Sequence, residues 1–382
     1  MKKFLLLTIA IILIVQLHSQ DVYSAGSFVN DNGTLSAAVF KNDAVIYAKK
    51  QLGRDLYSSA IAIDTVSGDI YWAANANPLS SISDGYGYVM KNDEIFLQNT
   101  HGTCINDIEL DGDDVYSAGY MNDIYNAVAA VWKNDDVTPL YTYASDKIRS
   151  YVLDIDVVDG MVYACGYYED GLNYGCVWVN GSVFAIYTGS KVANIEYKDG
   201  FIYYTVTDCL TTIYKSGAAQ YELYEYGHGA CNEVNGMVLA DDDVYSIGFL
   251  GFNDCIVWKN ADLFYSHPYS RDASLNAGFY YDNSLYYVGY DHESNGIIFK
   301  DGEQIHSLPN CALYDVWVMP NPLAVEEVAD SNSSVVFIYN VLGSLVKTVR
   351  SDDGSINTDD LPSGVYIAKR GGEVTKFFLT KE

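Results

Sequence analysis

Asp21-Val22-Tyr23-Ser24-Ala25-Gly26 recurs unchanged as Asp114-Val115-Tyr116-Ser117-Ala118-Gly119, and this repeated stretch, here called the tyrosine motif, decides the fold. Close variants end at Gly166, Gly248 and Gly289, and weaker copies cover residues 70–74 and 202–206. With the shared tyrosine as the marker, the seven copies follow one another at spacings of 48, 45, 47, 40, 42 and 41 residues. The marker residues are Tyr23, Tyr71, Tyr116, Tyr163, Tyr203, Tyr245 and Tyr286. Such a period indicates an array of similar structural units.

A second motif follows each tyrosine motif and consists of small or apolar residues, an aromatic residue and usually Lys-Asn, as in Ala130-Val131-Trp132-Lys133-Asn134. We call it the Lys-Asn motif. One copy of the repeat divides into four short strands, over residues 105–110, 115–119, 129–133 and 139–143. Pairs such as Asp111-Gly112 and Asn180-Gly181 provide the positive φ angles that tight hairpins need. Four strands at this period are typical of one blade of a β-propeller.

The sequence therefore predicts an all-β protein in which residues 20–319 form a seven-bladed β-propeller of four-stranded blades. The first copy has no leading strand, whereas Cys311–Val318, after the seventh copy, aligns with the leading strand Cys104–Leu110. Pairing of the N- and C-terminal strands in one blade would close the ring and remove exposed edges. Alternatively, Tyr314–Val318 is the first strand of the domain that follows.

The N-terminus has the pattern of an export signal. Lys2 and Lys3 precede an apolar run from Phe4 to Val15, and Ser19 suits the position before a cleavage site. This run is short for a membrane span. We expect residues 1–19 to be removed on export.

The tail from residue 320 has a different composition and carries four ordered motifs: Pro320-Asn321-Pro322, residues 338–343, residues 361–366 and residues 376–379. It resembles the C-terminal sorting domain of type IX secretion substrates of the Bacteroidetes. The resemblance implies a small β-sandwich over residues 320–382, a type IX secretion machinery as partner, and a secreted or outer-cell-surface location. The sorting residues that it implies are Pro320, Asn321, Pro322, Tyr339, Asn340, Gly343, Leu361, Pro362, Gly364 and Tyr366.

Composition limits the partners. The formal net charge of −28 disfavours nucleic acid and anionic membrane surfaces, because both are bound through Lys and Arg. No stretch after the leader has the length of a membrane helix, so we expect no membrane insertion. We also expect a monomer. Seven cysteines permit disulfides in an exported chain. Cys165 and Cys176 would pair across one hairpin, but small buried apolar side chains are the favoured interpretation for most of the seven.

Strands alternate in direction within a blade, so one face of the propeller carries the tight turns and the other carries the longer, more variable connections. Function concentrates on variable loops held by a rigid scaffold, and this long-loop face is the predicted binding surface. Tyrosines edged by acids suit a glycan or a protein partner, although packing is the alternative for each one. The predicted ligand-binding residues are Tyr86, Tyr120, Tyr125, Tyr167, Tyr168, Tyr174, Tyr269 and Tyr290.

The sequence contains no nucleophile elbow, zinc-protease helix motif or phosphate-binding loop, so no catalytic residue is predicted. The histidines lack metal-ligand spacing, and the acidic turns at residues 111–114 and 241–243 do not follow the pattern of a calcium loop. No metal or other cofactor is expected. A secreted or surface-displayed binding module is the leading hypothesis; the alternative is a polysaccharide hydrolase or lyase that uses carboxylates from different blades.

Overall fold

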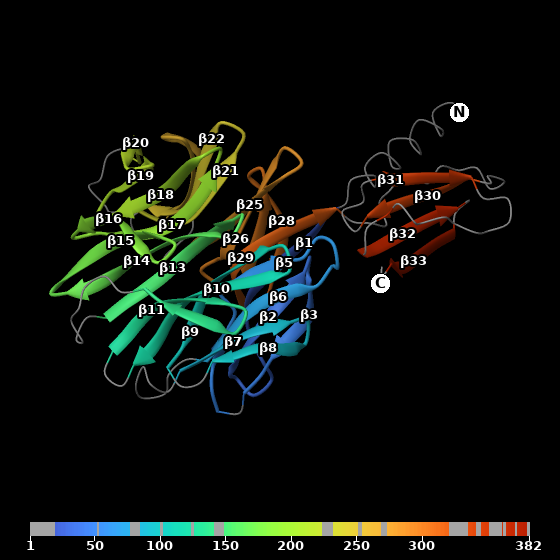
Figure 1. Cartoon of the computed structure of the whole chain (residues 1–382), viewed down its shortest axis with the longest axis horizontal. Helices are drawn as coiled ribbons and strands as arrows, with labels where there is room; N and C mark the ends of the chain where they lie inside the picture. Colours follow the sequence, from blue (N-terminus) through green and yellow to red (C-terminus); the bar gives the residue numbers. More distant parts are fainter. Residues whose placement is uncertain are drawn as a thin grey trace. The chain divides into compact units, whose positions relative to one another are not determined.

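The computed structural model describes residues 20–51, 53–76, 85–99, 102–123, 126–140, 149–223, 232–250, 254–268, 273–320, 335–340, 345–350, 361, 364–370 and 373–379. All its regular elements in these ranges are β-strands (Figure 1). No helix long and apolar enough to cross a membrane occurs in this part of the chain. The chain divides into two compact units, a large one of residues 23–62 and 70–317 and a second one that holds the C-terminal sheet.

Seven antiparallel sheets make the predicted seven-bladed β-propeller. Their strands, innermost first, are as follows. Blade 1 has β29 (Cys311–Pro320), β1 (Gln20–Val29), β2 (Leu35–Lys41) and β3 (Ala44–Lys49); blade 2 has β4 (Leu56–Tyr57) with β5 (Ile61–Ile63), β6 (Ile70–Ala76), β7 (Tyr86–Lys91) and β8 (Glu94–Asn99). Blade 3 has β9 (Cys104–Asp111), β10 (Asp114–Asp123), β11 (Asn126–Lys133) and β12 (Asp136–Pro139); blade 4 has β13 (Arg149–Val158), β14 (Met161–Asp170), β15 (Leu172–Val179) and β16 (Ser182–Thr188).

The remaining three blades repeat this order. Blade 5 has β17 (Lys191–Lys198), β18 (Phe201–Thr207), β19 (Thr211–Lys215) and β20 (Ala218–Glu222); blade 6 has β21 (Asn232–Ala240), β22 (Asp243–Leu250), β23 (Asp254–Lys259) and β24 (Asp262–Pro268); blade 7 has β25 (Ser274–Tyr281), β26 (Ser284–Tyr290), β27 (Gly296–Lys300) and β28 (Glu303–Leu308). In blade 2 the short strands β4 and β5 both pair with β6 and share the innermost position.

The ring closes between the two ends of the repeat. β29 is hydrogen-bonded to β1, so the strand missing from the first copy is supplied from beyond the seventh (Figure 1). Of the two alternatives for Tyr314–Val318, ring closure is therefore the one that holds. Leu313 and Val316 of β29 are fully buried, which ties the closing strand to the core.

The two sequence motifs meet across the middle pair of strands in each blade. Tyr116 stands opposite Lys133 in the β10–β11 register, and the lysine ammonium lies 5.3 Å from the tyrosine ring centroid. The same pairing recurs in every blade except blade 4, where Val179 stands opposite Tyr163. Cation–π contacts of this kind stabilise a cross-strand pair, which explains why tyrosine and lysine repeat together.

The asparagine of the Lys-Asn motif makes the hairpin that follows it. Asn134 has a φ of 54°, and its Oδ1 accepts a hydrogen bond from the Val115 N–H at 3.0 Å. Asn92 and Asn260 repeat both features. The fourth strand of this blade exists but begins earlier than the predicted residue 139, because the turn at Asn134 returns the chain at once and β12 spans Asp136–Pro139. Residues 141–143 of the predicted range lie outside the described residues.

The glycine that ends the tyrosine motif allows two strands to approach closely. At Gly119 a Cβ atom would collide with the carbonyl oxygen of Cys104 on the innermost strand, and at Gly248 it would collide with that of Glu233. A side chain at these positions would push the innermost strand away from the second strand, so the motif requires glycine there.

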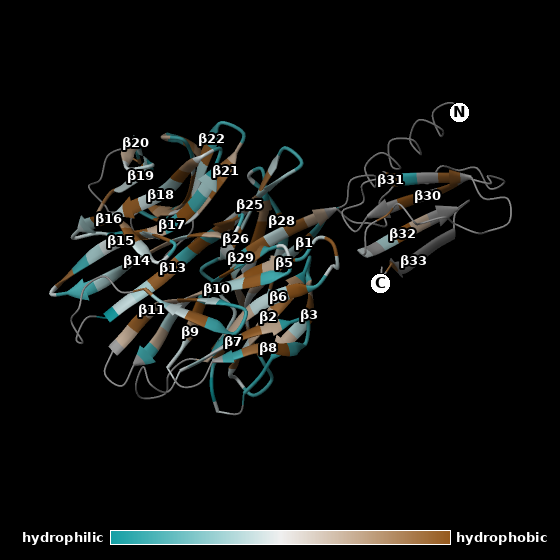
Figure 2. Ribbon diagram, in the orientation of Figure 1, coloured by the Kyte–Doolittle hydropathy of each residue, from teal (hydrophilic) through white to brown (hydrophobic). Residues whose placement is uncertain are grey.

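Apolar side chains hold neighbouring blades together. Trp178 of blade 4 is fully buried in a cluster with Tyr116 and Val131 of blade 3, and Trp258 belongs to a cluster that joins blades 5 and 6. Similar clusters join blade 2 to 3, 4 to 5 and 6 to 7. Figure 2 shows the apolar residues concentrated along the strands and hydrophilic residues at many of the turns. Each blade thus buries its faces against its neighbours, as expected of a propeller.

The structure decides between the two interpretations of Cys165 and Cys176, a disulfide or small buried side chains. Cys165 stands opposite Val177 and Cys176 opposite Gly166, and both thiols are free and buried, so they do not pair with each other. Cys104, Cys255 and Cys311 are also free and buried, as expected for small core side chains. Cys209 is disulfide-bonded, and Cys231 lies outside the described residues.

The described C-terminal strands form one antiparallel sheet in the order β31 (Leu345–Arg350), β30 (Val335–Asn340), β32 (Gly364–Arg370) and β33 (Glu373–Leu379). Val336, Ile338, Leu361 and Tyr366 form its buried cluster. Of the predicted sorting residues, Pro320 ends β29, Tyr339 and Asn340 lie in β30, and Gly364 begins β32. Asn321, Pro322, Gly343 and Pro362 lie outside the described residues.

Candidate functional site

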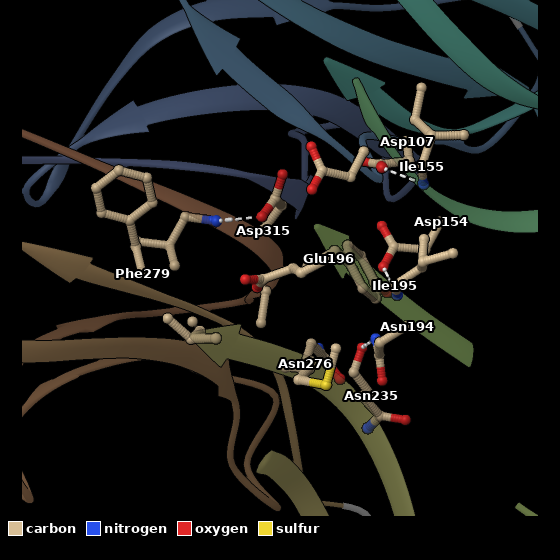
Figure 3. Close-up of a pocket in the computed structure, with 18 of the residues that line it drawn as sticks. Asp107, Asp154, Ile155, Asn194, Ile195, Glu196, Asn235, Asn276, Phe279 and Asp315 are labelled. Atoms are coloured by element: carbon tan, nitrogen blue, oxygen red, sulfur yellow. Dashed lines mark hydrogen bonds between the residues drawn. The ribbon is translucent and has the colours of Figure 1, made fainter. Parts of the chain in front are cut away.

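The innermost strands of all seven blades surround a cavity of about 440 Å³, here called the channel. Six acids line it: Asp107, Glu109, Asp154, Asp156, Glu196 and Asp315. No lysine or arginine is among the described residues of its wall. Figure 3 shows the carboxyl groups of Asp107, Asp154, Glu196 and Asp315 gathered around the same space. The channel is therefore a concentrated region of acidic groups inside the ring.

A bulge in the innermost strands directs amide side chains between blades. The β9–β10 register shifts at Asn106, and equivalent shifts occur in blades 4 to 7. The Asn106 amide donates to the Val152 carbonyl of the next blade at 2.5 Å, Asn235 donates to Leu275 at 2.8 Å, and Asn276 donates to Leu313 at 2.6 Å. These bonds satisfy carbonyls that the bulges remove from the ladder and connect successive blades.

Carboxylates complete these connections between blades. Asp107 accepts a hydrogen bond from the Ile155 N–H of the next blade at 2.9 Å, and Asp154 accepts one from Ile195 at 2.7 Å. Glu196 accepts from Leu239 at 3.1 Å, and Asp315 accepts from Ile61 at 2.8 Å. Asp107 and Asp315 each accept a further hydrogen bond from the next residue of their own strand, Ile108 at 2.9 Å and Val316 at 2.7 Å. Each of these acids therefore has at least one structural hydrogen bond while it lines the channel with the other acids.

Burial raises the pKa of every channel acid. Desolvation, with the charge of Asp156 as a further cause, raises the pKa of Glu196 to about 8. Desolvation and the charge of Asp107 raise the pKa of Asp315 to about 8. Desolvation and the neighbouring Asp107 also hold the pKa of Asp154 well above its usual range, and the two carboxyl groups share a hydrogen bond. A hydrogen bond between two carboxyl groups requires a proton on one of them, so this pair shares a proton.

A row of tyrosines lies near the N-terminal ends of the innermost strands. Tyr314 and Tyr57 have ring centroids 6.3 Å apart, and the Tyr57 hydroxyl lies 3.2 Å from the Cys104 thiol. Tyr120 lies 5.2 Å from Tyr151, which lies 4.9 Å from Tyr167. We call these five tyrosines of blades 1 to 4 the tyrosine arc. All five side chains are half-buried, so each ring is held in place and leaves an edge or face accessible.

Charge and burial set the properties of the arc. The Lys191 ammonium lies 4.7 Å from the Tyr167 ring centroid and ends the arc at blade 5. Burial, with the charge of Tyr151 as a further cause, raises the pKa of Tyr167 to about 12. Burial also raises the pKa of the Cys104 thiol to about 11. The hydroxyl groups are therefore neutral at physiological pH and able to donate as well as accept hydrogen bonds.

The predicted ligand-binding tyrosines do not form one group in the structure. Tyr120 and Tyr167 lie in the arc, Tyr86 lies under the Arg54 guanidinium at 5.0 Å, and Tyr290 is a half-buried residue of β26. Tyr168 is buried and stacks on Tyr174 at 4.8 Å, so its ring packs in the core and is not available to a ligand. Tyr125 and Tyr269 lie outside the described residues.

Sequence reasoning missed Tyr57, Tyr151 and Tyr314 of the arc as well as the channel acids. The acids had a visible signal, because Asp107-Ile108-Glu109 and Asp154-Ile155-Asp156 place a carboxyl group at alternate positions of the innermost strand. Charged residues on the side of a strand that faces the propeller axis line its channel.

No family model matches the chain, and no curated protein matches it. Among solved structures, the chain is similar to the computationally designed Ika8 protein (14% identity, TM-score 0.42, covering 84% of this chain and 96% of that one) and to the WD40 β-propeller domain of Doa1 (15% identity, TM-score 0.42, covering 81% and 96%). A nidogen/laminin complex is also similar (13% identity, TM-score 0.37, covering 78% and 98%).

Proposed function

We propose that this protein is an extracellular binding module and that its tyrosine arc takes a carbohydrate chain. The observation that carries the proposal is the arrangement of the arc, in which five half-buried tyrosines come from four blades. The Tyr57–Tyr314 pair and the Tyr120–Tyr151–Tyr167 row meet at the Cys104 thiol, which interacts with Tyr57 and Tyr120. Rings held by packing present apolar area with little loss of conformational entropy on binding, and their hydroxyls supply hydrogen bonds.

A glycan fits this surface better than a protein partner. A sugar chain presents alternating apolar ring faces and hydroxyl groups, which match separate rings with polar edges. Two described cations lie beside the arc, Lys191 at Tyr167 and Arg149 at Tyr151. The whole chain, with a net charge of −28, nevertheless repels polyanions, so the expected glycan is neutral. Large exposed apolar side chains such as Phe184 and Leu263 lie on outer strands, away from the arc.

Export to the cell surface or beyond is the second part of the proposal. The leader at residues 1–19 and the motifs of residues 320–382 favour type IX secretion, with that machinery as a partner and a member of the Bacteroidetes as the source. The disulfide at Cys209 supports an oxidising location, because such bonds persist mainly outside the cytosol. Detection of the mature chain in culture medium or on intact cells would test this part.

The binding proposal is tested with a glycan array and the mature full-length chain. Tyr151→Ala should weaken binding to a neutral glycan about tenfold, since a central aromatic contact is removed. Phe184→Ala, which removes an exposed ring on β16, is the matched control and should bind normally. Tyr151→Phe keeps the ring and should retain most of the affinity. Unchanged binding by Tyr151→Ala, or recognition of protein targets only, would contradict the proposal.

A glycan-active enzyme is the second candidate. Its support is the raised pKa of Glu196 and Asp315, to about 8, since a general acid must hold its proton near neutral pH. Release of oligosaccharides from a panel of polysaccharides, abolished by Glu196→Gln, would favour this candidate over simple binding.

A further inference from the structure

We infer that Asn32, in the connection between β1 and β2, is a site of spontaneous deamidation, which converts its side-chain amide to a carboxylate. This modification is independent of the proposed carbohydrate binding. Asn-Gly is the dipeptide in which the reaction is easiest, because glycine has no side chain to shield its backbone nitrogen. The sequence contains four Asn-Gly dipeptides, and the structure describes all of them. They begin at Asn32, Asn180, Asn235 and Asn295, and Asn32 alone has the geometry that the reaction needs.

The reaction has two steps, and its only reagent is water. The Gly33 nitrogen attacks Cγ of Asn32, its proton is transferred through solvent to Nδ2, and Nδ2 leaves as ammonia, so that a five-membered succinimide ring forms. Water then opens the ring. Cleavage of the bond from Cγ to the Gly33 nitrogen gives aspartate, and cleavage of the bond from the backbone carbonyl carbon gives isoaspartate. Both products carry one more negative charge than the native chain, and nothing is oxidised or reduced.

The amide nitrogen that must leave is free only at Asn32. This side chain is exposed, and its Nδ2 donates to no described residue. At the other three sites the same nitrogen is held: Asn180 donates to Sδ of Met161 at 2.9 Å, Asn235 to the Leu275 carbonyl at 2.8 Å, and Asn295 to Oδ2 of Asp291 at 3.2 Å. Departure of ammonia costs a hydrogen bond at these three sites and costs none at Asn32.

The carboxamide of Asn32 is also turned toward its own backbone. Its Oδ1 accepts hydrogen bonds from the Thr34 N–H at 3.1 Å and from the Thr34 hydroxyl at 2.8 Å. A side chain that bonds two residues ahead folds over the intervening peptide bond, which brings Cγ toward the Gly33 nitrogen. The same two donors stabilise negative charge on Oδ1 as the nitrogen attacks. Oδ1 of Asn180 instead accepts the Val162 N–H at 2.9 Å, which holds that carboxamide against another strand.

The surroundings of Gly33 leave room for the reaction. Its φ is 81°, and beyond the adjacent residues no atom lies within 4 Å of the position that a Cβ would occupy. Its N–H donates to the Asn30 carbonyl at 2.9 Å, and this one bond must open before the nitrogen attacks. Gly236 and Gly296 lie within β21 and β27, where a Cβ would be 2.9 Å and 2.5 Å from atoms of the next blade. A succinimide ring at either of these two sites would have to move a strand.

The experiment follows the four asparagines by peptide mapping while the full mature chain is kept in mildly alkaline buffer, once folded and once unfolded in urea. In urea the four should react at similar rates, because each is then an Asn-Gly pair in a flexible chain. In the folded chain Asn32 should react about tenfold faster than each of the other three. Equal rates for the four in the folded chain, or earlier conversion of Asn180, Asn235 or Asn295, would overturn the inference.

Two variants of Thr34 test the geometry around the reacting amide. Thr34→Val loses the hydroxyl donor, so Asn32 should react several-fold more slowly in the folded chain and at an unchanged rate in urea. Thr34→Ser keeps the hydroxyl and is the matched control. A folded Thr34→Val chain that reacts as fast as the native chain would contradict this geometry. Tyr151→Ala should deamidate at the native rate, so failure of the carbohydrate proposal would leave this inference standing.

Discussion

Asn134 holds a backbone conformation that few side chains tolerate, with a φ of 54°, while its Oδ1 accepts the Val115 N–H at 3.0 Å. Asn134→Ala loses the hydrogen bond and keeps the strain, so we expect a loss of about 1–2 kcal/mol in the free energy of unfolding. Asn134→Gly relieves the strain and should cost less. Urea unfolding would measure both variants, with exposed Asp136→Ala as an unaffected control. An alanine variant as stable as the native chain would contradict this explanation of the repeated asparagine.

Single residues show where sequence reasoning succeeds and where it fails. The positive φ angles at Gly112 and Asn180 follow from local turn chemistry, and they were predictable because a hairpin needs no information from elsewhere in the chain. Tyr167 and Tyr168 are adjacent in the same strand, yet one lies in the arc and the other is buried on Tyr174. That difference depends on which side of the strand faces a neighbouring blade, which residue type does not reveal.

At the scale of elements, the number of strands and the order of the blades follow from the period of the repeat. The bulges of the innermost strands and the divided innermost strand of blade 2 do not follow from it. The bulge at Asn106 recurs in other blades and turns amides toward the next blade. A bulge is set by the geometry of packing around the axis, so only the acids beside it had a signal in the sequence. Blade 2 replaces its innermost strand with β4 and β5, a division that its repeat copy did not predict.

β29 allows a direct test of ring closure. A chain ending at residue 310 lacks β29 and leaves one edge of β1 unpaired, whereas a chain ending at residue 320 keeps the complete ring. Loss of buried Leu313 and Val316 should abolish cooperative unfolding of the shorter chain and promote association through the open edge. Differential scanning calorimetry and light scattering would measure these effects. A cooperative, monomeric chain ending at residue 310 would show that β29 is dispensable.

For the whole molecule, the channel makes stability depend on pH in an unusual direction. The pKa of Glu196 and that of Asp315 are raised to about 8, whereas the unfolded chain titrates these groups near 4. The native state therefore binds more protons between these values, and the free energy of unfolding must fall as pH rises from about 4 to 8. We expect a total loss on the order of a few kcal/mol between pH 5 and pH 9, measured by urea unfolding.

Glu196→Gln tests the cause of that loss. Its side-chain oxygen can still accept the Leu239 N–H, but it carries no charge, so the variant should match the native chain at pH 5 and exceed its stability at pH 9. The acids that interact with Glu196 are Asp154, Asp156 and Glu109, and Lys198 is the nearby cation. Titration of these acids should leave a smaller slope in the variant. Equal stability of the native chain at pH 5 and pH 9 would contradict the prediction. Lower stability of Glu196→Gln than of the native chain at pH 9 would also contradict it.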